Sequence, residues 1–367
     1  MDLSVTQENL AKALSSVSRV TSSRTQLPIL SNILIRTDGN RLLVAAMNME
    51  IASTQYIGAK INKPGAITIP SRLITDFVAS LPKDTVELVV KDNHLHIKSG
   101  KYTSVVNGMA ADDFPELPAV EEEKAVSYVI SASDFKQAVT QTIITTSNDA
   151  TRPVLTGVYW HSHDGFIYLA GTDGYRLAER RLMETTSEVS AIIPTTSLQE
   201  ALRQLSDDIK EVEVLFDDTQ VCFRIGESQI TSQLIDGNFP DYRQLIPDTT
   251  NTSVVIRKDD FTRITKIAGL FSRDSGGSIT ITSDVEAKLL SLHSIASELG
   301  ENTSEATADI SGDNGTVSLN SRYLSEALSV IDGSEVSFSF SGKLAPCLLT
   351  DNTKDTNYKH IVMPLKS

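Results

Sequence analysis

One pattern occurs three times in this chain of 367 residues, and the repetition limits the folds that the chain can adopt. Apolar residues at positions i, i+3, i+4 and i+7 mark one face of a helix. Such a stripe recurs at offsets of 124 and 126 residues, in Ile74, Phe77, Val78 and Leu81, then in Leu198, Ala201, Leu202 and Leu205, and finally in Leu324, Ala327, Leu328 and Ile331. Three matched stripes predict three similar folding units.

Each predicted helix follows a short apolar strand and a residue able to cap its N-terminus. The junctions read Ile69-Pro70-Ser71, Ile193-Pro194-Thr195 and Leu319-Asn320-Ser321. Ser, Thr and Asn side chains accept hydrogen bonds from the first free backbone N–H groups of a helix. We therefore expect a strand, a cap and a helix in each repeat.

A second family of helices keeps the same period. Its apolar stripes contain Leu10, Leu14 and Val17, then Phe135, Val139 and Thr142, then Phe261, Ile264, Ala268 and Phe271. Between the helices, alternating segments are broken by turns such as Asp38-Gly39 and Asp164-Gly165, which predict hairpins. The fold class expected is α+β, with two helices packed on antiparallel sheet in each repeat.

The length of the chain agrees with three domains, since a third of it has the commonest domain size. Polar stretches after Pro118 and Pro247 mark the boundaries. We predict domains at residues 1–120, 125–248 and 253–367. No segment is apolar enough to cross a membrane, and no signal sequence follows Met1, so we expect a cytoplasmic protein without a membrane partner.

Charge alone argues against a nucleic-acid partner, because the formal net charge is −14. The distribution of basic residues favours one. Lys12 and Arg19 lie on one face of a predicted helix, and Arg263, Lys266 and Arg273 share another at the same repeat position. Either these are ordinary solvated helix faces, or they meet a common polyanion.

Catalytic and metal motifs are sparse. The sequence has no glycine-rich phosphate loop and no cysteine pair at metal spacing, and Cys222 and Cys347 give no disulfide framework. The pairs His94-x-His96 and His161-x-His163 could each present two imidazoles on one side of a strand, but neither has a third ligand nearby. We expect no enzyme activity, cofactor or metal.

Three motifs, in order, resemble a known family. Residues 172–178 read Thr-Asp-Gly-Tyr-Arg-Leu-Ala, residues 236–243 read Asp-Gly-Asn-Phe-Pro-Asp-Tyr-Arg, and residues 361–365 read Ile-Val-Met-Pro-Leu. Together with Leu-Pro-Ile-Leu at 27–30 and the threefold repeat, they resemble the bacterial sliding clamp, the beta subunit of DNA polymerase III. From the residues alone, 170–177 is equally a strand, a tight Asp-Gly turn and a returning strand.

The resemblance implies a processivity factor for DNA replication. Two subunits would join head-to-tail, and six similar clamp domains would form a ring around duplex DNA with helices lining the hole. The contacts with DNA would be electrostatic and independent of sequence. The DNA-facing residues implied are Lys12, Arg24, Arg72, Lys136, Arg203, Arg263, Lys266 and Arg322. Only Arg24 belongs to a matched motif, and the others follow from helix position.

The family also binds short client peptides from DNA polymerase III and other polymerases, the clamp loader and repair proteins, in a groove between the second and third domains. The matching positions are Leu155, Thr172, Gly174, Tyr175, Arg176, Leu177, Pro240, Leu245, Asn320, Tyr323, Pro346, Ile361, Val362, Met363, Pro364 and Leu365. We expect Leu155, Leu177, Val362 and Met363 to form its apolar floor, with Met363 adapting to different clients. The alternative for the C-terminal segment is a plain edge strand.

The chain differs from relatives in places. Pro153 and Val154 stand where aromatic residues are common, Lys366-Ser367 ends the chain, and Asp149 occupies a loop expected to face DNA. The dimer contact implied by the family joins the edge strand at Ser104, Val105 and Val106 to the edge of the third domain near Leu270 and Phe271.

Two other classes of function remain possible from the residues. A repeat-built enzyme would require a cluster of His, Cys or carboxylate groups at a domain junction. An interaction scaffold would hold peptides without encircling nucleic acid.

Overall fold

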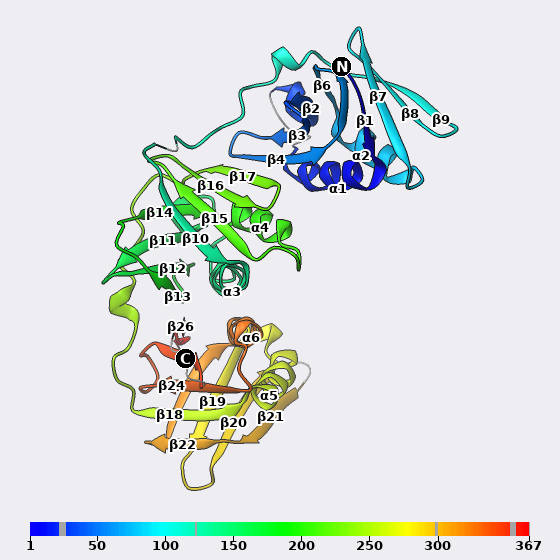
Figure 1. Cartoon of the computed structure of the whole chain (residues 1–367). Helices are drawn as coiled ribbons and strands as arrows, with labels where there is room; N and C mark the ends of the chain where they lie inside the picture. Colours follow the sequence, from blue (N-terminus) through cyan, green and yellow to red (C-terminus); the bar gives the residue numbers. More distant parts are fainter. Residues whose placement is uncertain (22–26, 122, 298–299, 353–356, 367) are drawn as a thin grey trace. The chain divides into compact units, whose positions relative to one another are not determined.

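The computed structural model describes residues 1–21, 27–121, 123–297, 300–352 and 357–366. They form two compact units: unit 1 contains residues 1–133 and 196–234, and unit 2 contains residues 134–195 and 235–367. Every sheet is antiparallel and lies within one unit (Figure 1).

Unit 1 contains a five-stranded and an eight-stranded sheet. In spatial order the first is β5 (Lys60–Lys63), β1 (Asp2–Thr6), β7 (Thr85–Lys91), β8 (His94–Ser99) and β9 (Tyr102–Asn107). The second is β10 (Val126–Ser131), β15 (Glu211–Phe216), β16 (Gln220–Ile225), β17 (Ser228–Gln233), β4 (Ile51–Gly58), β3 (Arg41–Met47), β2 (Asn32–Asp38) and β6 (Ala66–Pro70).

Unit 2 contains a nine-stranded and a four-stranded sheet. The first is β14 (Ser190–Pro194), β11 (Gly157–His163), β12 (Phe166–Thr172), β13 (Arg176–Glu184), β26 (Tyr358–Val362), β25 (Cys347–Asp351), β24 (Glu335–Phe340), β18 (Thr252–Arg257) and β22 (Asp309–Gly312). The second is β21 (Gly300–Thr307), β20 (Leu289–Ala296), β19 (Ser278–Asp284) and β23 (Gly315–Asn320).

All six predicted helices are present. They are α1 (Gln7–Val17), α2 (Ser71–Ser80), α3 (Ala132–Ile143), α4 (Thr195–Gln204), α5 (Lys258–Leu270) and α6 (Ser321–Val330). Short 3₁₀ helices are η1 (Ser18–Val20), η2 (Pro28–Ser31), η3 (Ala111–Asp113), η4 (Pro153–Leu155), η5 (Arg243–Leu245) and η6 (Arg273–Ser275). The predicted α+β class is confirmed, and within the units α1 packs on α2 and α5 on α6 (Figure 1).

The helical stripes are buried as their spacing predicts. Leu10, Leu14 and Val17 belong to one core cluster in unit 1, together with Ile74 and Val78. The corresponding cluster in unit 2 contains Phe261, Ile264, Ala268, Leu324, Ala327 and Leu328. Phe271 differs, because α5 ends at Leu270 and leaves Phe271 as its partly exposed C-cap.

The predicted capping is right for one helix and wrong for another. Asn320 caps α6, where its side chain accepts hydrogen bonds from the backbone N–H groups of Arg322 and Tyr323. At α2 the N-cap is Pro70, without a side-chain bond, and Ser71 is the first helical residue. The reason is a different use of the hydroxyl. Ser71 bonds Thr21 (3.2 Å), as Thr195 bonds Thr146 (2.9 Å) and Ser321 bonds Ser272 (3.0 Å), so in each repeat a hydroxyl pair ties the second helix to the chain beyond the first.

Candidate functional site

The turn between β12 and β13 is held by its own polar side chains. Asp173 Oδ1 accepts hydrogen bonds from the backbone N–H groups of Tyr175 (2.9 Å) and Arg176 (3.1 Å). The Thr172 hydroxyl donates to the Arg176 carbonyl (2.7 Å) and accepts from Gly174 N–H (3.1 Å). Gly174 has a φ of +93°, which favours glycine. The turn leaves the Tyr175 side chain 61% exposed.

The C-terminal segment lies against this turn. In the β13–β26 ladder, Arg176 faces Val362 and Leu177 faces Ile361. Beyond the ladder, Met363 N–H donates to the Tyr175 carbonyl (2.9 Å), and Leu365 N–H donates to the Ser318 carbonyl (2.8 Å). The structure therefore brings together two segments of the predicted groove that lie almost 190 residues apart in the sequence.

The predicted apolar floor divides between the two faces of the sheet. Leu177, Ile361 and the partly buried Met363 belong to one apolar cluster with Tyr242. Val362 faces the other way and is fully buried in a separate core cluster. Successive strand residues point to opposite faces, so the prediction that Val362 offers a floor was wrong. Leu155 ends η4 and is 6% exposed.

Arg176 is the buried cation of the site. Its side chain is only 7% exposed, its Nε lies 3.1 Å from Asp173 Oδ2, and its Nη1 pairs with Glu326 of α6. Its guanidinium carbon lies 4.4 Å from the centre of the Tyr323 ring. The resemblance to the family predicted Arg176 and Tyr323 as groove residues but did not predict Glu326. The available signal was position, since Glu326 follows Asp76 and Glu200 at the offsets of the helical repeat.

The remaining predicted groove residues occupy three places. Asn320 caps α6 and donates to the Gly276 carbonyl (3.2 Å), so it shares the first turn of that helix with Tyr323. Leu245 ends η5 and is 41% exposed, and Pro240 precedes it in the same connecting segment. Pro346 directly precedes β25 and, like Pro364 and Leu365, is partly buried.

A buried polar network anchors the segment that carries Pro240 and Leu245. The Tyr242 hydroxyl donates to Glu179 Oε2 (2.7 Å) and bonds His161 Nε2 (2.8 Å). Arg243 Nη2 lies 3.3 Å from Glu179 Oε2, and its guanidinium carbon lies 4.3 Å from the centre of the Tyr168 ring. Because β13 carries Glu179, the network ties the connecting segment to the strand that begins at Arg176.

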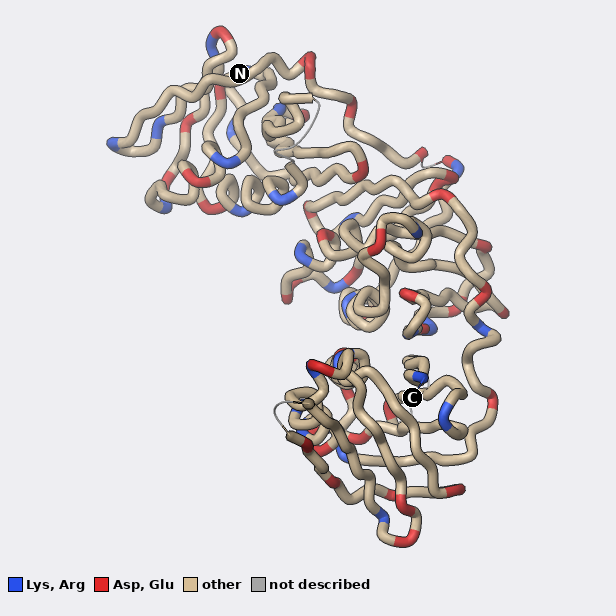
Figure 2. The backbone as a smooth tube through the Cα atoms, turned by 180° about the vertical axis from the view of Figure 1, so that it is seen from behind, with Lys and Arg blue, Asp and Glu red and all other residues tan. Residues whose placement is uncertain are grey.

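Seven of the eight predicted DNA-facing residues lie exposed on helices. Arg24 lies outside the described residues. The others are Lys12 on α1, Arg72 on α2, Lys136 on α3, Arg203 on α4, Arg263 and Lys266 on α5, and Arg322 on α6. Figure 2 shows basic and acidic positions close together on the helices. Asp149 pairs with Arg152 (3.6 Å), and the hydroxyl and backbone N–H of Thr151 lower the pKa of its carboxyl.

The predicted dimer residues occupy an edge strand and a helix end. Ser104, Val105 and Val106 lie in β9, the edge of its sheet; Val105 is 56% exposed, but Val106 is buried in the core. Leu270 and Phe271 are not in a strand, since they end α5. That helix packs over β20 and β21, and β21 is the edge of the four-stranded sheet. Leu270 is 56% exposed.

Other candidate chemistry is confined to single groups. Among the described residues, no three His, Cys, Asp or Glu side chains are grouped to hold a metal ion. Both cysteines are free and buried, and burial raises the pKa of Cys347 to about 12. No helix in the described ranges is both long and apolar enough to cross a membrane.

Known proteins resemble this arrangement along its entire length. Three family models match in succession: the N-terminal domain of the DNA polymerase III beta subunit at residues 1–118, its central domain at 129–241 and its C-terminal domain at 243–366. The beta sliding clamp of Bacillus subtilis is 30% identical over 380 residues, covering 100% of both chains. The chain belongs to the beta sliding clamp family.

Solved structures of sliding clamps agree in fold. The crystal structure of the clamp from Bacillus subtilis has a TM-score of 0.95 at 28% identity and covers 100% of this chain and 99% of that one. The beta subunit from Pseudomonas aeruginosa has a TM-score of 0.94 at 25% identity, with 100% of each chain covered. The beta sliding clamp of Synechococcus elongatus is 30% identical over 379 residues, which are 100% of this chain and 99% of that clamp. The predicted family and the three clamp domains are thereby confirmed.

We expect this sliding clamp to lose stability in acid through two buried histidines. Burial lowers the pKa of His161 to about 4 and that of His360 to about 3, against 6.5 for an unperturbed histidine. Below pH 6.5 the two histidines become protonated in the unfolded chain but stay neutral in the folded chain. Their contribution to the free energy of unfolding is therefore fully present above pH 6.5 and decreases as the pH falls towards 4. Each histidine contributes a slope of up to about 1.4 kcal/mol per pH unit.

Denaturation midpoints measured between pH 7 and pH 4 test this expectation. His161→Phe removes one of the two protons, so its stability should depend less steeply on pH than that of the wild type, whatever its absolute stability. His94→Phe, at an exposed position of β8, is the control. An identical pH dependence in wild type and His161→Phe would contradict the assignment.

Proposed function

We propose that the chain forms a homodimeric ring that encircles duplex DNA and tethers DNA polymerase III and other replication and repair proteins. Family membership supports the proposal, and so does the pairing of strands at the repeat junctions. The three matched family models support domains at residues 1–120, 125–248 and 253–367. The ring acts as a processivity factor in the cytoplasm and needs no catalytic site of its own.

The observation that carries the proposal is a strand ladder repeated at two junctions. In unit 1, β17 pairs with β4, and Ile230 faces Ser53. In unit 2, β26 pairs with β13, and His360 faces Ala178. The third repeat has a strand equivalent to β4 and β13, namely the edge strand β21, and the first has one equivalent to β17 and β26, namely the edge strand β9. A second copy of the chain supplies each edge with its partner.

Ladder partners within each repeat fix which residues are equivalent. Leu3, Tyr128 and Val254 occupy the same position in the first strand of each repeat, four residues before the first helix begins. When ladder partners are followed from that strand across the next two, they lead to Ser104, Ile230 and His360, which are therefore equivalent. In the same way Thr54, Glu179 and Thr303 are reached from Thr68, Ile192 and Ser318. In the two internal ladders, Ile230 faces Ser53 and His360 faces Ala178, and each of these facing residues directly precedes Thr54 or its equivalent Glu179. Ser104 of one subunit therefore faces Asn302 of the other.

The helices above the two edges support the same contact. At the internal junctions, the Ser16 hydroxyl of α1 donates to Gln204 of α4 (2.6 Å), and the Gln141 amide of α3 donates to the Val330 carbonyl of α6 (3.1 Å). The equivalent residues are Ile267 of α5 and Ser80 of α2. The two helices expose apolar residues: Ile267 is 36% and Leu270 56% exposed on α5, and Leu73 is 53% exposed on α2. Dimerisation buries them.

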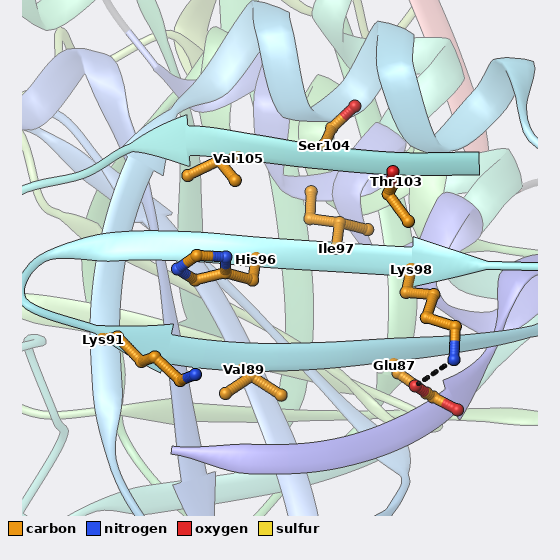
Figure 3. Close-up of a pocket in the computed structure, with 9 residues that line it drawn as sticks. All are labelled: Glu87, Val89, Lys91, His96, Ile97, Lys98, Thr103, Ser104 and Val105. Carbon is orange, nitrogen blue, oxygen red and sulfur yellow. Dashed lines mark ion pairs between the residues drawn. The ribbon is translucent and has the colours of Figure 1, made fainter.

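The outer face of β9 carries a shallow hollow beside this edge. Figure 3 shows its side chains across three neighbouring strands, with Val89, His96 and Val105 in one row. An ion pair between Lys98 and Glu87 (3.6 Å) closes one end. Val105 lies on the face opposite the buried Val106, so the row of Val89, His96 and Val105 lies outside the core.

A cysteine pair tests the register. We expect Ser104→Cys with Asn302→Cys to yield a covalent dimer on mild oxidation, because facing residues of an antiparallel ladder have Cβ atoms about 4.5–5.5 Å apart. The product is read on a non-reducing gel. Thr303→Cys in place of Asn302→Cys is the matched control, since its side chain points to the opposite face. Equal cross-linking of both pairs, or monomer alone, would contradict the ladder.

Encirclement has its own test. After a clamp loader and ATP have placed the protein on nicked circular DNA, we expect it to remain through a high-salt wash and to leave once the circle is cut. Salt displaces proteins held by phosphate contacts alone, whereas a closed ring leaves only over an end. Retention is measured by gel filtration of the DNA complex. Loss during the wash would exclude the ring.

The groove for client peptides follows from the turn 172–177 and the C-terminal segment. Leu177, Ile361 and Met363 form an apolar cluster beside the guanidinium of Arg176. Leu177 and Ile361 are buried in it, and Met363, Leu245 and Tyr175 are the accessible members of the site. This mixture suits a peptide that inserts apolar side chains and bonds through its backbone.

Peptide affinity tests the groove. Met363→Ala should weaken binding of a polymerase-derived clamp-binding peptide by about 1–3 kcal/mol, as the loss of a buried interface contact does, and Leu177→Ala should act similarly. Fluorescence anisotropy with a labelled peptide gives the dissociation constant. Met49→Ala changes the same residue type at a position that is 70% exposed and serves as control. Unchanged affinity in both groove variants would remove the assignment.

A further inference from the structure

The second helix of each repeat carries a carboxylate at one repeated position. Asp76, Glu200 and Glu326 each follow by two residues the first member of the apolar stripe, at offsets of 124 and 126 residues. Each forms an ion pair with an arginine of its own helix, and Glu326 also holds Arg176 of the candidate peptide site. The pairs are Arg72–Asp76 (3.8 Å) on α2, Arg203–Glu200 on α4 and Arg322–Glu326 (3.7 Å) on α6.

These three arginines are all predicted to face DNA, and a fourth DNA-facing arginine also forms an ion pair within its own helix. Arg263 of α5 pairs with Asp260 one turn earlier, at 3.1 Å. The lysines of the first helices differ, because Lys12, Lys136 and Lys266 make no ion pair within the ranges that the structure describes. The helices therefore offer two kinds of cation, arginines that already hold a carboxylate in an ion pair and lysines that do not. Lys12 acts on a carboxyl only at longer range, where it adds to the Ser206 hydroxyl in lowering the pKa of Asp208.

Glu200 shows the arrangement most fully. The residue is 8% exposed, and its Oε1 accepts a hydrogen bond from Arg203 Nη1. Its Oε2 is buried and finds no hydrogen-bond partner among the described residues. Arg19, in the short helix η1 that follows α1, lines the same hollow as Glu200 and Arg203. A carboxylate with an unsatisfied oxygen thus pairs with Arg203 and shares a hollow with Arg19 in unit 1.

We propose that Asp76, Glu200 and Glu326 are built-in counter-anions that weaken the hold of these arginines on DNA phosphates. The proposal rests on the proposed encirclement of DNA. A phosphate reaching Arg203 must compete with Glu200 and is repelled by it. An arginine already neutralised by a carboxylate also contributes less of the electrostatic free energy that a free cation gains from phosphate.

The consequence concerns sliding. A ring that cannot dissociate sideways gains nothing from deep phosphate contacts, because each contact must break before the ring advances. These carboxylates recur in all three domains, and therefore six times in the dimer. They reduce the variation in binding free energy as the ring moves along the DNA, while the lysines keep the helices attractive to DNA phosphates. Glu200 acts through Arg203, which makes it a positioning residue.

The test compares wild type with Glu200→Gln in the intact dimer, loaded on stretched duplex DNA and followed by single-molecule imaging. We expect the diffusion coefficient of Glu200→Gln to fall about two- to fivefold, the range that a released surface ion pair supports. Binding to short linear duplexes should also depend more steeply on salt, with the logarithmic slope larger by about 1–2 for the two subunits. Glu200→Asp keeps the charge and should slide nearly as wild type does.

Two outcomes would overturn the proposal. One is an unchanged diffusion coefficient and salt slope in Glu200→Gln. The other is equal slowing in Glu188→Gln, which changes net charge by the same amount at an exposed position between β13 and β14 and would make net charge the cause. Failure of encirclement itself is seen separately, because wild type would then leave nicked circular DNA in the high-salt wash.

Discussion

Antiparallel pairing across the repeat junctions is the interaction on which the rest of this structure depends. The β17–β4 ladder joins the first repeat to the second, and the β13–β26 ladder joins the second to the third. Each ladder satisfies the backbone groups of two strands that would otherwise be edges. The same pairing places Arg176 opposite Val362, so the candidate peptide site exists because the C-terminal strand completes a sheet begun in the central repeat. It also leaves β9 and β21 as complementary edges, which is the physical basis of the proposed dimer.

The hydrophobic period predicted the helices, and the motifs predicted the candidate site. Neither predicted which side chains pair with one another. The helical stripes were found because burial imposes a 3.6-residue period, and Leu10, Ile74 and Phe261 are indeed fully buried. The N-cap of α2 was wrong because Ser71 uses its hydroxyl for Thr21, a contact 50 residues away. Val362 was misplaced because motif matching gives a position in the chain and not the face of a strand. The network of His161, Glu179 and Tyr242 was missed because its members are separated in sequence and follow no period.

Basic residues on the helices of this molecule are distributed differently from what its negative net charge suggests. A net charge of −14 opposes DNA at long range, but screening limits that effect to about 8 Å at physiological ionic strength. In the proposed ring, contacts at the helices would therefore determine how the protein holds DNA. There, arginines form ion pairs with carboxylates of their own helices, while Lys12, Lys136 and Lys266 form none with the residues that the structure describes. In the proposed ring, attraction and mobility would thus be set by different residues of the helices, which the net charge alone does not reveal.

The repeated frame also explains why a client groove is proposed at one junction and not at both. The backbone bond from Met363 N–H to the Tyr175 carbonyl (2.9 Å) recurs as the bond from Gln233 N–H to the Glu50 carbonyl (2.9 Å). The side chains on that frame differ: Gln233 replaces Met363, and Ile51 replaces Arg176. The first junction therefore keeps the geometry but lacks the adaptable apolar side chain and the buried guanidinium. Backbone pairing builds the junctions alike, and a few side chains give one of them the chemistry for binding a peptide.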